Sequence, residues 1–589
     1  MIRRPNRQNV LATSSVPAPI GGLNARDSIA AMPPTDAIVM VNWFPTPTTI
    51  DVRNGSVSWS TGITGNVETL FAYNGLTGVQ LFAAAGTSFY DCTAQGPATL
   101  IQTVGVASSR WSYTNFGTPG GQFLVAVDGL SSGQIYNGTA WTRWTDGTGV
   151  AITSITNVGT LATLTTTTPH GLLTGSQVTV SGATPAAYNG TFIITVTGTN
   201  TFTYTMLSNP GGSAAPVGTL TFGYPVTGLA TSLLNYVTPF KGRLYFIQRD
   251  TLKIWYLPPA SVGGALTVFD LSSVFRLGGH LVAMQSWNVD TVQGPNDYFA
   301  FFSSTGEVVV YNGFDPSQSS TWNLVGNFRI GRPAAGSRFL QKVGADIYVV
   351  TVDGMTPLSK AMLTDRSQNN YQISAKIDNL IQADVSAYPN NFGWQLLLHP
   401  VGNKIIINVP QVQDTISYQY VCNTITGAWT TFQQWNANVF ELYGDRLMYG
   451  TAGAVNWCDT GFSDLGAAIV TDLKPAFSSF GMPAQNKQYT MVRPIFSDTG
   501  SPGISATLNI DYRDNQPTQS LNLPAQANVS FWNVSTWNVS MWSTQGSVTI
   551  NWQSVSGVGY VASYRMKTIT KAQCSLLGID YGYQSGGIY

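Results

Sequence analysis

FLVAVDGLSSGQIYNGTAW, residues 123–141, is the stretch that decides the fold. It opens with the apolar run Phe123–Val127, reverses at Asp128-Gly129, continues through residues 134–138 and ends at Trp141. Dipeptides such as Asp-Gly between apolar runs are typical of β-hairpins, because glycine readily takes the positive φ that tight turns require. The stretch therefore predicts successive antiparallel strands, with Trp141 at the start of the third.

The same unit recurs between residues 51 and 465. Each copy has an apolar run, a turn, and a second run that ends near an aromatic or apolar residue; the other copies are residues 81–91, 244–255, 298–313, 347–358, 405–423 and 446–457. Trp322 and Trp429 follow turns as Trp141 does, so each is expected to begin a strand. Tyr90 and Tyr136 are 46 residues apart, and Tyr311 and Leu358 are 47 apart. A period of roughly 45–50 residues is typical of four-stranded propeller blades.

One interval is too long, and an insertion explains it. Tyr136 and Trp255 are 119 residues apart, but residues 149–222 between them are Thr-rich and contain no Asp, Glu, Lys or Arg. Alternating strand patterns at residues 177–181, 191–196 and 201–205 predict a small β domain inserted at a surface loop. Without it, residues 51–148 and 223–465 predict a β-propeller of about seven blades, with six or eight possible. An array of β-sandwiches with accidental spacing is the alternative.

The composition agrees with an all-β chain. Only 10% of the 589 residues are charged, against roughly 25% in an average soluble domain, and Glu occurs three times. Helix-rich folds need Glu and Lys on their surfaces, and a nucleic-acid coat needs excess cations, whereas the net charge here is zero. Residues 1–50 are expected to be an extended arm with one short helix at 35–43. Residues 466–589 predict a β-sandwich-like platform domain, with strands near 506–512, 547–552 and 576–581.

No catalytic constellation emerges from the sequence. Phosphate-binding loops, His-Glu-x-x-His and acidic calcium loops are missing, and the three histidines (His170, His280 and His399) are scattered. Glu68 and Glu441 occur in similar contexts and are interpreted as a repeated blade position, whereas Glu307 falls in a turn. The four cysteines, none in a Cys-x-x-Cys pair, are expected to be buried and reduced. We therefore predict no catalytic, cofactor-binding or metal-binding residue, and no enzyme.

Two features are candidates for docking a subunit or partner. Arg3, Arg4 and Arg7 form a basic arm that Pro5 keeps extended; a frayed, solvated terminus is the alternative. Trp532, Trp537 and Trp542 recur every five residues, which matches neither a helix nor a strand and predicts a loop. These rings are expected to pack against a surface, and a carbohydrate-stacking platform is the alternative.

Residues 18–55 carry a family resemblance. The stretch Gly21–Asp27 (GGLNARD), the stretch Met32–Pro45 and Val52–Gly55 (VRNG) together resemble the N-terminal segment of tail proteins from short-tailed bacteriophages. The tryptophan repeat and the C-terminal Ile579-Asp580-Tyr581 resemble that group too, and the insert resembles small β modules of phage structural proteins. The family indicated is the tail nozzle, also called tail tubular protein B or tail hub.

The resemblance implies a structural virion protein rather than an enzyme. Such proteins pair a β-propeller with a platform domain and form a sixfold ring, which continues the DNA ejection channel below the portal and adaptor. The implied partners are other copies of the chain (a homohexamer), the head–tail adaptor, tail fibres or a tail needle, and double-stranded DNA in transient passage. The implied location is the virion tail, after assembly in the host bacterial cytoplasm. A receptor-binding or glycan-degrading tail protein and a plug for packaged DNA remain as alternatives.

Overall fold

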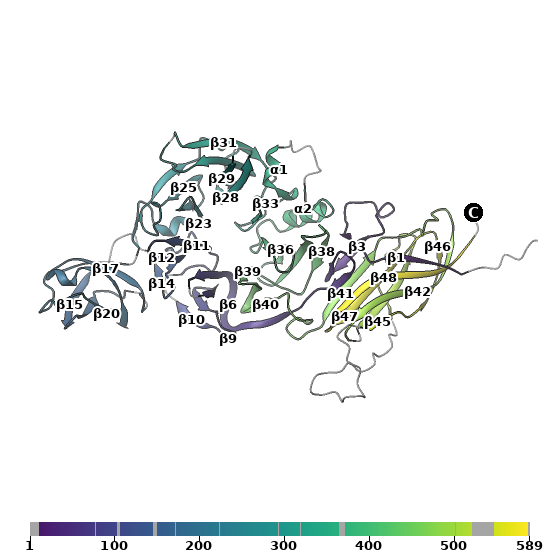
Figure 1. Ribbon diagram of the computed structural model, residues 1–589, viewed down its shortest axis with the longest axis horizontal. Coiled ribbons are helices and arrows are strands. Elements are labelled where there is room, and N and C mark those ends of the chain that lie inside the picture. The colour runs from purple at the N-terminus through teal and green to yellow at the C-terminus, as the bar shows by residue number, and fades with distance from the viewer. Residues whose placement is uncertain are drawn as a thin grey trace, which may run out of the picture.

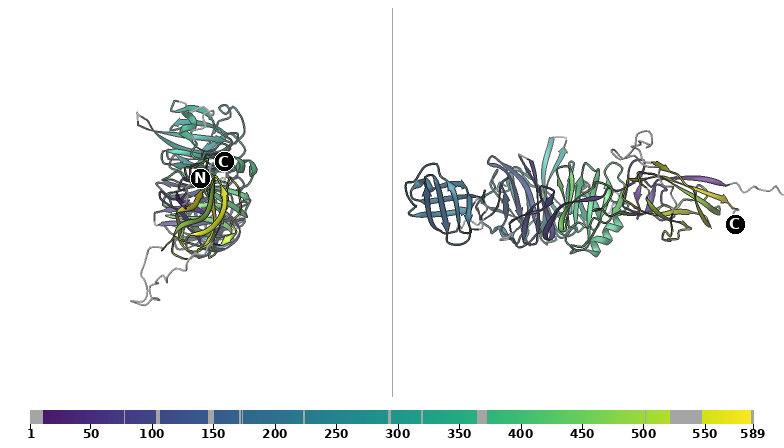
Figure 2. Two further views of the ribbon diagram at one scale, coloured as in Figure 1. Left: turned by 90° about the vertical axis from the view of Figure 1, so that its right-hand side faces the viewer. Right: turned by 90° about the horizontal axis from the view of Figure 1, so that it is seen from below.

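The computed structural model describes residues 11–76, 78–102, 106–144, 150–170, 172, 174–222, 224–291, 294–318, 320–363, 372–500, 502–520 and 547–586. A ring of radially arranged sheets occupies the middle of the molecule (Figure 1). A small β module lies beyond one side of the ring and a β-sandwich beyond the other, so the three parts follow one another along the longest axis (Figures 1 and 2).

The ring is a β-propeller in which the described residues form seven blades. Blade 1 contains the second half of β6 (Ser56–Gly75), β7 (Gly78–Ala85), β8 (Ser88–Asp91) and β10 (Thr99–Gln102). Blade 2 contains β11 (Ser112–Thr118), β12 (Gly121–Val127), β13 (Gln134–Tyr136) and β14 (Trp141–Arg143). Blade 3 contains β23 (Leu234–Phe240), β24 (Arg243–Gln248), β25 (Lys253–Tyr256) and β27 (Thr267–Asp270), and a short parallel pair, β22 (Val226–Thr227) and β26 (Gly264–Ala265), lies beside it.

The remaining blades follow in chain order. Blade 4 contains β28 (Leu281–Thr291), β29 (Gly294–Ser303), β30 (Glu307–Gly313) and β31 (Trp322–Arg329). Blade 5 contains β32 (Leu340–Val343), β33 (Asp346–Thr351) and β34 (Gly354–Pro357), followed by helices α1 (Leu358–Leu363) and α2 (Asp378–Ala387). Blade 6 contains β35 (Gln395–His399), β36 (Lys404–Val412), β37 (Ile416–Asn423) and β38 (Trp429–Phe432). As predicted, Trp141, Trp322 and Trp429 each begin a strand, the fourth of their blade.

Blade 7 closes the ring and corrects one prediction. Residues 446–457, like the other copies, are expected to contain a turn between two runs, but they form one strand, β40 (Arg446–Cys458), in which Gly453 at φ +76° sits in a β-bulge. β40 pairs with β39 (Val439–Tyr443) on one side and with the first half of β6 on the other, while β9 (Gly96–Pro97) pairs with β6. Because β6 belongs to both blade 7 and blade 1, it joins the end of the propeller to its beginning.

The insert forms two sheets around a core of its own. β15 (Ile152–Val158), β16 (Leu161–Thr166), β20 (Thr201–Thr205) and β19 (Thr195–Gly198) make one sheet, and β18 (Gly190–Ile193), β17 (Gln177–Ala183) and β21 (Val217–Phe222) make the other. The buried apolar cluster between them, which includes Ile155, Leu164, Val178 and Phe202, contains only residues of the insert.

The platform is a two-sheet sandwich. One sheet contains β1 (Ala12–Pro17), β4 (Trp43–Pro45), β5 (Ile50–Val52), β42 (Lys487–Asp498), β45 (Ser547–Thr549), β46 (Gln553–Gly559) and β48 (Cys574–Ser585). The other contains β2 (Gly22–Leu23), β3 (Asp36–Val41), β41 (Ile469–Pro475), β43 (Gly503–Ile510), β44 (Gln519–Ser520) and β47 (Ala562–Thr570). At Val41, β3 also pairs in parallel with Thr431 of β38, so this second sheet continues into blade 6.

The sandwich corrects two predictions for residues 1–50. The helix expected at 35–43 is strand β3, because Ile38, Val39 and Val41 favour extended backbone and β41 supplies an antiparallel partner. From residue 12 onward, the segment expected to be a separate arm is built into the sandwich: β1 pairs along β48, and β5 pairs with β48 at Leu576. The buried apolar cluster of the platform also runs on into blades 4, 5 and 6.

The four cysteines are buried and unpaired, as expected. Burial raises the pKa of the Cys92 and Cys422 thiols to about 12. Since the thiolate is the reactive form, these cysteines are poorly reactive in the folded protein. None of the helices in the described ranges is long and apolar enough to cross a membrane.

Candidate functional site

Arg53 lies at the centre of the joint between the propeller and the platform. Its guanidinium donates to both carboxylate oxygens of Asp464, at 3.1 and 2.6 Å, and its Nε donates to Asn42 Oδ1 at 2.8 Å. The remaining two N–H groups donate to the carbonyls of Asn54 (2.8 Å) and Gln433 (2.6 Å). All five donors therefore have a partner, although the Arg53 side chain is fully buried.

The surroundings of Arg53 come from both bodies. Its guanidinium lies over the Trp435 ring at 4.5 Å, and Trp435 Nε1 donates to Asp464 Oδ1 at 3.1 Å. Asn42, which stands directly after β3, donates to the carbonyl of Val470 on β41 at 2.7 Å. The pair thus ties the last blade of the propeller to the platform strands, with charge-assisted bonds in a site closed to water.

Four further residues of the stretch 18–55, Gly21, Asn24, Asp36 and Gly55, pack at the same joint. A Cβ on Gly21 would lie 2.1 Å from Asp36 Oδ1, and one on Gly55 would lie 2.0 Å from the carbonyl oxygen of Ser463, so only glycine fits. Asn24 donates to Asp36 at 2.7 Å, and Lys376, which follows blade 5, donates to the same carboxylate group at 2.9 Å. Residues of the stretch 18–55 therefore help to hold the platform against blades 5, 6 and 7.

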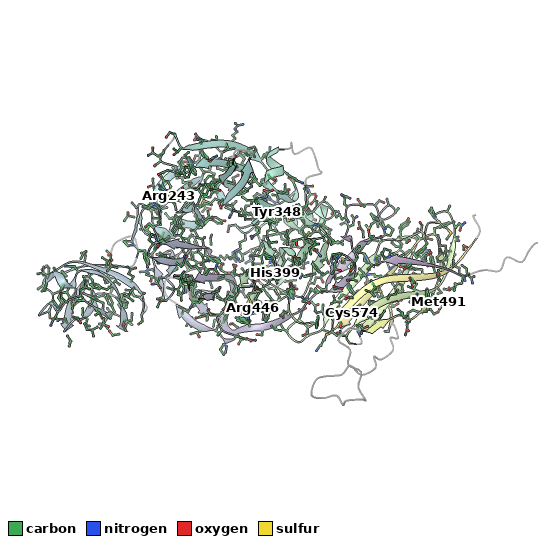
Figure 3. The ribbon with its side chains drawn as sticks, viewed as in Figure 1. Arg243, Tyr348, His399, Arg446, Met491 and Cys574 are labelled. Atoms are coloured by element: carbon green, nitrogen blue, oxygen red, sulfur yellow. The ribbon has the colours of Figure 1, made fainter. Side chains whose placement is uncertain are left out.

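A second buried charge cluster flanks the joint. Asp459 accepts from Lys404 Nζ at 2.8 Å and from Asn54 Nδ2 at 3.1 Å, and His399 Nε2 lies 3.4 Å from it. Burial alone would raise the pKa of Asp459, but the bonds from His399 and Lys404 lower it to about 2. His399 lies on the side of the ring that faces the platform (Figure 3). The cluster therefore fixes the β35–β36 turn against the chain that leaves blade 7.

The ring axis holds a cavity that every blade helps to line. It has a volume of about 250 Å³ and is lined by residues from the first strand of each blade: Leu70, Tyr113, Tyr236, Gln285, Leu340, Gln395 and Glu441 among them. A second cavity of about 310 Å³, the outer axial cavity, shares Trp111, Ser112, Ser337 and Arg338 with it. It opens among loops, where Asp128, Asp250, Phe392 and Trp394 line it. The side chains of the ring surround an opening at its centre (Figure 3).

Arg338, which lies just before β32, stands where the two cavities meet. It donates to the carbonyl of Glu68 at 2.9 Å, to Thr69 Oγ1 at 2.9 Å and to the carbonyl of Trp111 at 3.2 Å. One side chain of blade 5 thus bonds blade 1 and the entry to blade 2. Arg338 and Arg110 both lie over the Phe392 ring, at 5.3 and 4.3 Å.

Glu68 and Glu441, the two acids near Arg338, differ in their surroundings. Glu68 accepts from Arg110 Nε at 2.8 Å and from the Ser109 hydroxyl. Burial raises the pKa of Glu441 to about 7, although Tyr113, the Leu442 N–H and the Arg338 charge all lower it. Burial likewise lowers the pKa of Arg338 to about 10, so the guanidinium stays charged at neutral pH. The axis therefore carries a cation bonded to neutral oxygens, beside an acid that titrates near neutrality.

The predicted docking residues lie outside the described residues. This applies to Arg3, Arg4 and Arg7, and also to Trp532, Trp537 and Trp542. Of the histidines, His170 is buried in the insert, where its Nδ1 accepts from the Leu172 N–H at 3.0 Å, a structural role. Glu68 and Glu441 do occupy matching innermost strands, as interpreted. Glu307, expected in a turn, instead begins strand β30, where it accepts from the backbone N–H groups of Arg276 and Leu277. Across the part of the chain that the structure describes, no three His, Cys, Asp or Glu side chains form a group that could hold a metal ion.

Sequence reasoning missed Arg338 and Arg53. Arg53 falls within the family-like stretch, but nothing there marks it as a buried charge, and its partner lies 411 residues away along the chain. Arg338 stands in a Gly-Ser-Arg turn that has no motif. The available signal was scarcity: with only 28 basic residues in the chain, each one close to a strand is a candidate for a specific contact.

No family model matches the sequence, and no curated protein matches it. Similar solved structures include Raptor from Chaetomium thermophilum, with a TM-score of 0.31 and 8% identity over 70% of this chain; the match spans only 28% of Raptor. PorZ of the type-IX secretion system of Porphyromonas gingivalis has a TM-score of 0.28 and 11% identity, covering 81% of this chain and 69% of PorZ. A Trypanosoma rangeli sialidase has a TM-score of 0.21 and 9% identity, covering 88% and 94% of the two chains. These likenesses concern the propeller-like β architecture alone.

Proposed function

We propose that this chain is a structural subunit of a phage tail nozzle. Six copies would form a ring in the virion tail that continues the DNA ejection channel below the portal and adaptor and anchors tail fibres. One observation carries the proposal: the residues that resemble the nozzle N-terminal segment, Asn42 and Arg53 above all, build the buried joint that fixes the platform on the propeller. A ring subunit that transmits load between its neighbours needs such a rigid joint.

The charge of the chain supports the same function. DNA must slide through a conduit, and few cations with zero net charge give little phosphate attraction. A closed ring of identical copies also needs two different complementary patches on each subunit. The linear order of insert, propeller and platform separates such patches along the molecule (Figure 2).

Electron microscopy of the purified chain tests the proposal. Closed sixfold rings are the expected result. Docking of these rings onto a phage particle below its adaptor would support the proposal further. Trimers would count against a nozzle, because receptor-binding spikes are usually threefold. A chain that remains monomeric at every concentration would also contradict the proposal.

A receptor-binding or glycan-degrading tail protein is the second candidate. The outer axial cavity supports it, because Trp111, Phe392 and Trp394 line this cavity together with the carboxylate of Asp250. The exposed Asp250 carboxylate can accept hydrogen bonds from sugar hydroxyl groups at the rim of this cavity. Hydrolysis of host polysaccharide that Asp250→Asn abolishes would favour this candidate over the nozzle.

A further inference from the structure

A groove opens at the outer end of the platform sandwich. Its volume is about 450 Å³, and Phe477, Ser479, Pro483, Asp511, Tyr512 and Tyr560 line it. Tyr512 and Tyr560 are 45% and 40% exposed, whereas Phe477 is buried behind them. The groove therefore offers aromatic faces to whatever enters it.

Tyr512 is held there in a strained conformation. Its φ is +64° and that of Asp511 is +49°, in the left-handed region that a bulky residue rarely adopts. This backbone sets the Tyr512 ring 5.0 Å from the Phe477 ring while leaving it half-exposed. Glycine would remove the strain, so the presence of a half-exposed tyrosine points to a role for its ring beyond folding.

The rim of the groove also carries a fixed carboxylate. Asp511 is exposed, and its Oδ1 accepts from the N–H groups of Tyr560 at 2.8 Å and Val561 at 3.3 Å. The nearby Lys487 ammonium is engaged below by the carbonyls of Met482, Gln485 and Tyr560. Aromatic faces with a carboxylate suit an arginine-rich segment, because guanidinium groups stack on rings and pair with carboxylates.

The position of β1 indicates where such a segment comes from. At this end of the sandwich the strands run in the order β1, β48, β42, β46, since Ala12 pairs with Tyr583 and Lys487 pairs with both Ser585 and Gly559. β1 therefore begins, at Ala12, on one edge of this end, and Tyr560, which lines the groove, directly follows β46 three strands away. The ten residues before Leu11 could span up to about 33 Å, against about 14 Å for three strand spacings.

We propose that this groove receives residues 1–10 of the next copy, with the guanidinium groups of Arg3, Arg4 and Arg7 on Tyr512, Tyr560 and Asp511. The inference rests on the proposed ring of identical subunits. A donor segment at one edge and an acceptor groove at the other make the head-to-tail contact that a closed ring requires.

Cysteine cross-linking in the full chain tests the contact directly. The four native cysteines are buried, so Asn6→Cys and Ser479→Cys would supply the reactive thiols. When the two single variants are mixed and oxidised, a reducible dimer should form, several-fold more than when Thr191→Cys on the insert replaces Ser479→Cys. A disulfide that forms only within single chains of the double variant would show that each arm occupies its own groove and would overturn the proposal.

A second variant separates binding from folding. Tyr512→Gly should weaken assembly on the order of tenfold, as loss of an aromatic anchor does, yet leave the unfolding of the subunit cooperative, because relief of the left-handed backbone offsets part of the lost contact with Phe477. Asp414→Gly relieves a similar left-handed residue in a distant hairpin (φ +63°) and should not affect assembly. Equal assembly by Tyr512→Gly and the parent chain would contradict the proposal.

The two proposals fail in different ways. Closed rings in which Asn6→Cys and Ser479→Cys form no cross-link between copies would remove this contact and leave the nozzle function intact. Cross-linked chains that never close into rings would keep the contact and remove the nozzle.

Discussion

The propeller–platform joint and the ring axis each hold an arginine, fully buried at the joint and half-buried at the axis, and they satisfy its charge in opposite ways. Arg53 pairs with both oxygens of Asp464 and has a partner for every donor. Arg338 bonds neutral oxygens in the contacts described above, and burial lowers its pKa to about 10. We therefore expect the stability of the joint to depend on the ion pair of Arg53 with Asp464. The stability of the axis should depend less on charge, because the partners of Arg338 are neutral oxygens.

Removing Arg53 should have the largest effect. Arg53→Met leaves the Asp464 carboxylate buried without its counter-ion, which typically costs about 3–5 kcal/mol. We expect the propeller and the platform, which share one apolar core, to unfold together in the parent chain and in two separate calorimetric transitions in the variant. Arg26→Met, which loses only an exposed pair with Asp27, is the control and should shift stability by less than about 0.5 kcal/mol. A single unshifted transition in Arg53→Met would break the comparison.

Arg338→Met should cost less, about 1–3 kcal/mol. The carbonyls of Glu68 and Trp111 would lose a donor, but no carboxylate bonded to Arg338 would be left without a cation, and the desolvation of that cation would be relieved. Calorimetry should show one transition at a lower temperature. Arg243→Met, on the rim with Asp315 at 2.6 Å, is the matched control and should cost less still. A loss as large as that of Arg53→Met would show that the axis depends on charge as strongly as the joint does.

Glu441 sharpens the comparison through pH. Its folded pKa of about 7 lies above the ordinary 4.5, so the folded state holds the proton more tightly than the unfolded state does. This contribution to stability is complete below pH 4.5 and is lost as the pH rises toward 7, by about 3 kcal/mol at 1.36 kcal/mol per pKa unit.

Glu441→Gln should remove that loss. The difference between the melting temperatures at pH 5 and pH 8 is the measurement, and it should shift toward greater stability at pH 8 in the variant than in the parent chain. Asp250→Asn, which changes an exposed carboxylate at the outer axial cavity, is the control and should leave the difference unchanged. An identical pH dependence in Glu441→Gln would mean that Glu441 is not desolvated at the axis.

Local chemistry made much of the fold predictable. Turn dipeptides and the tryptophans that open outer strands, such as Trp141, marked the blades, since both act within a few residues of chain. The closure by β6 was not predictable, because a single run of strand residues does not reveal that its two halves pair with different blades. The helix predicted at residues 35–43 failed for a related reason: β41, more than 400 residues later, supplies the partner that makes it a strand.

The candidate sites were harder to predict than the fold. Arg53 and Asp464, like Arg338 and Glu68, are brought together only by ring closure and platform docking, and their separations of 411 and 270 residues leave no local pattern. The scarcity of charged residues marks these four as unusual, but it does not indicate which arginine contacts which acid.

Deleting the insert should have the smallest effect on both arginine sites. Residues 149–222 carry no charged side chain and have their own core, so they contribute to neither the joint nor the axis. The chain on either side is anchored independently: Trp144 Nε1 donates to the carbonyl of Val262 at 3.0 Å, and the Tyr224 ring packs 5.3 Å from that of Phe123. Replacing the insert with a short Gly-Ser linker should therefore change the unfolding free energy of the propeller by less than about 1 kcal/mol, since a surface loop closes at little cost.

Calorimetry of the deletion variant checks this, with Arg53→Met introduced in the same background. We expect the cooperative transition of the propeller and platform to persist after the deletion. Arg53→Met should split this transition as it does in the full chain, because the insert has its own core and none of the contacts described for the joint involves it. Loss of cooperative unfolding on deletion alone would refute the independence of the insert. It would also mean that the two arginine sites depend on the insert. The hydrogen bond described between the insert and blade 2 is a long one, from Asn137 Nδ2 to the carbonyl of Gly175 at 3.4 Å.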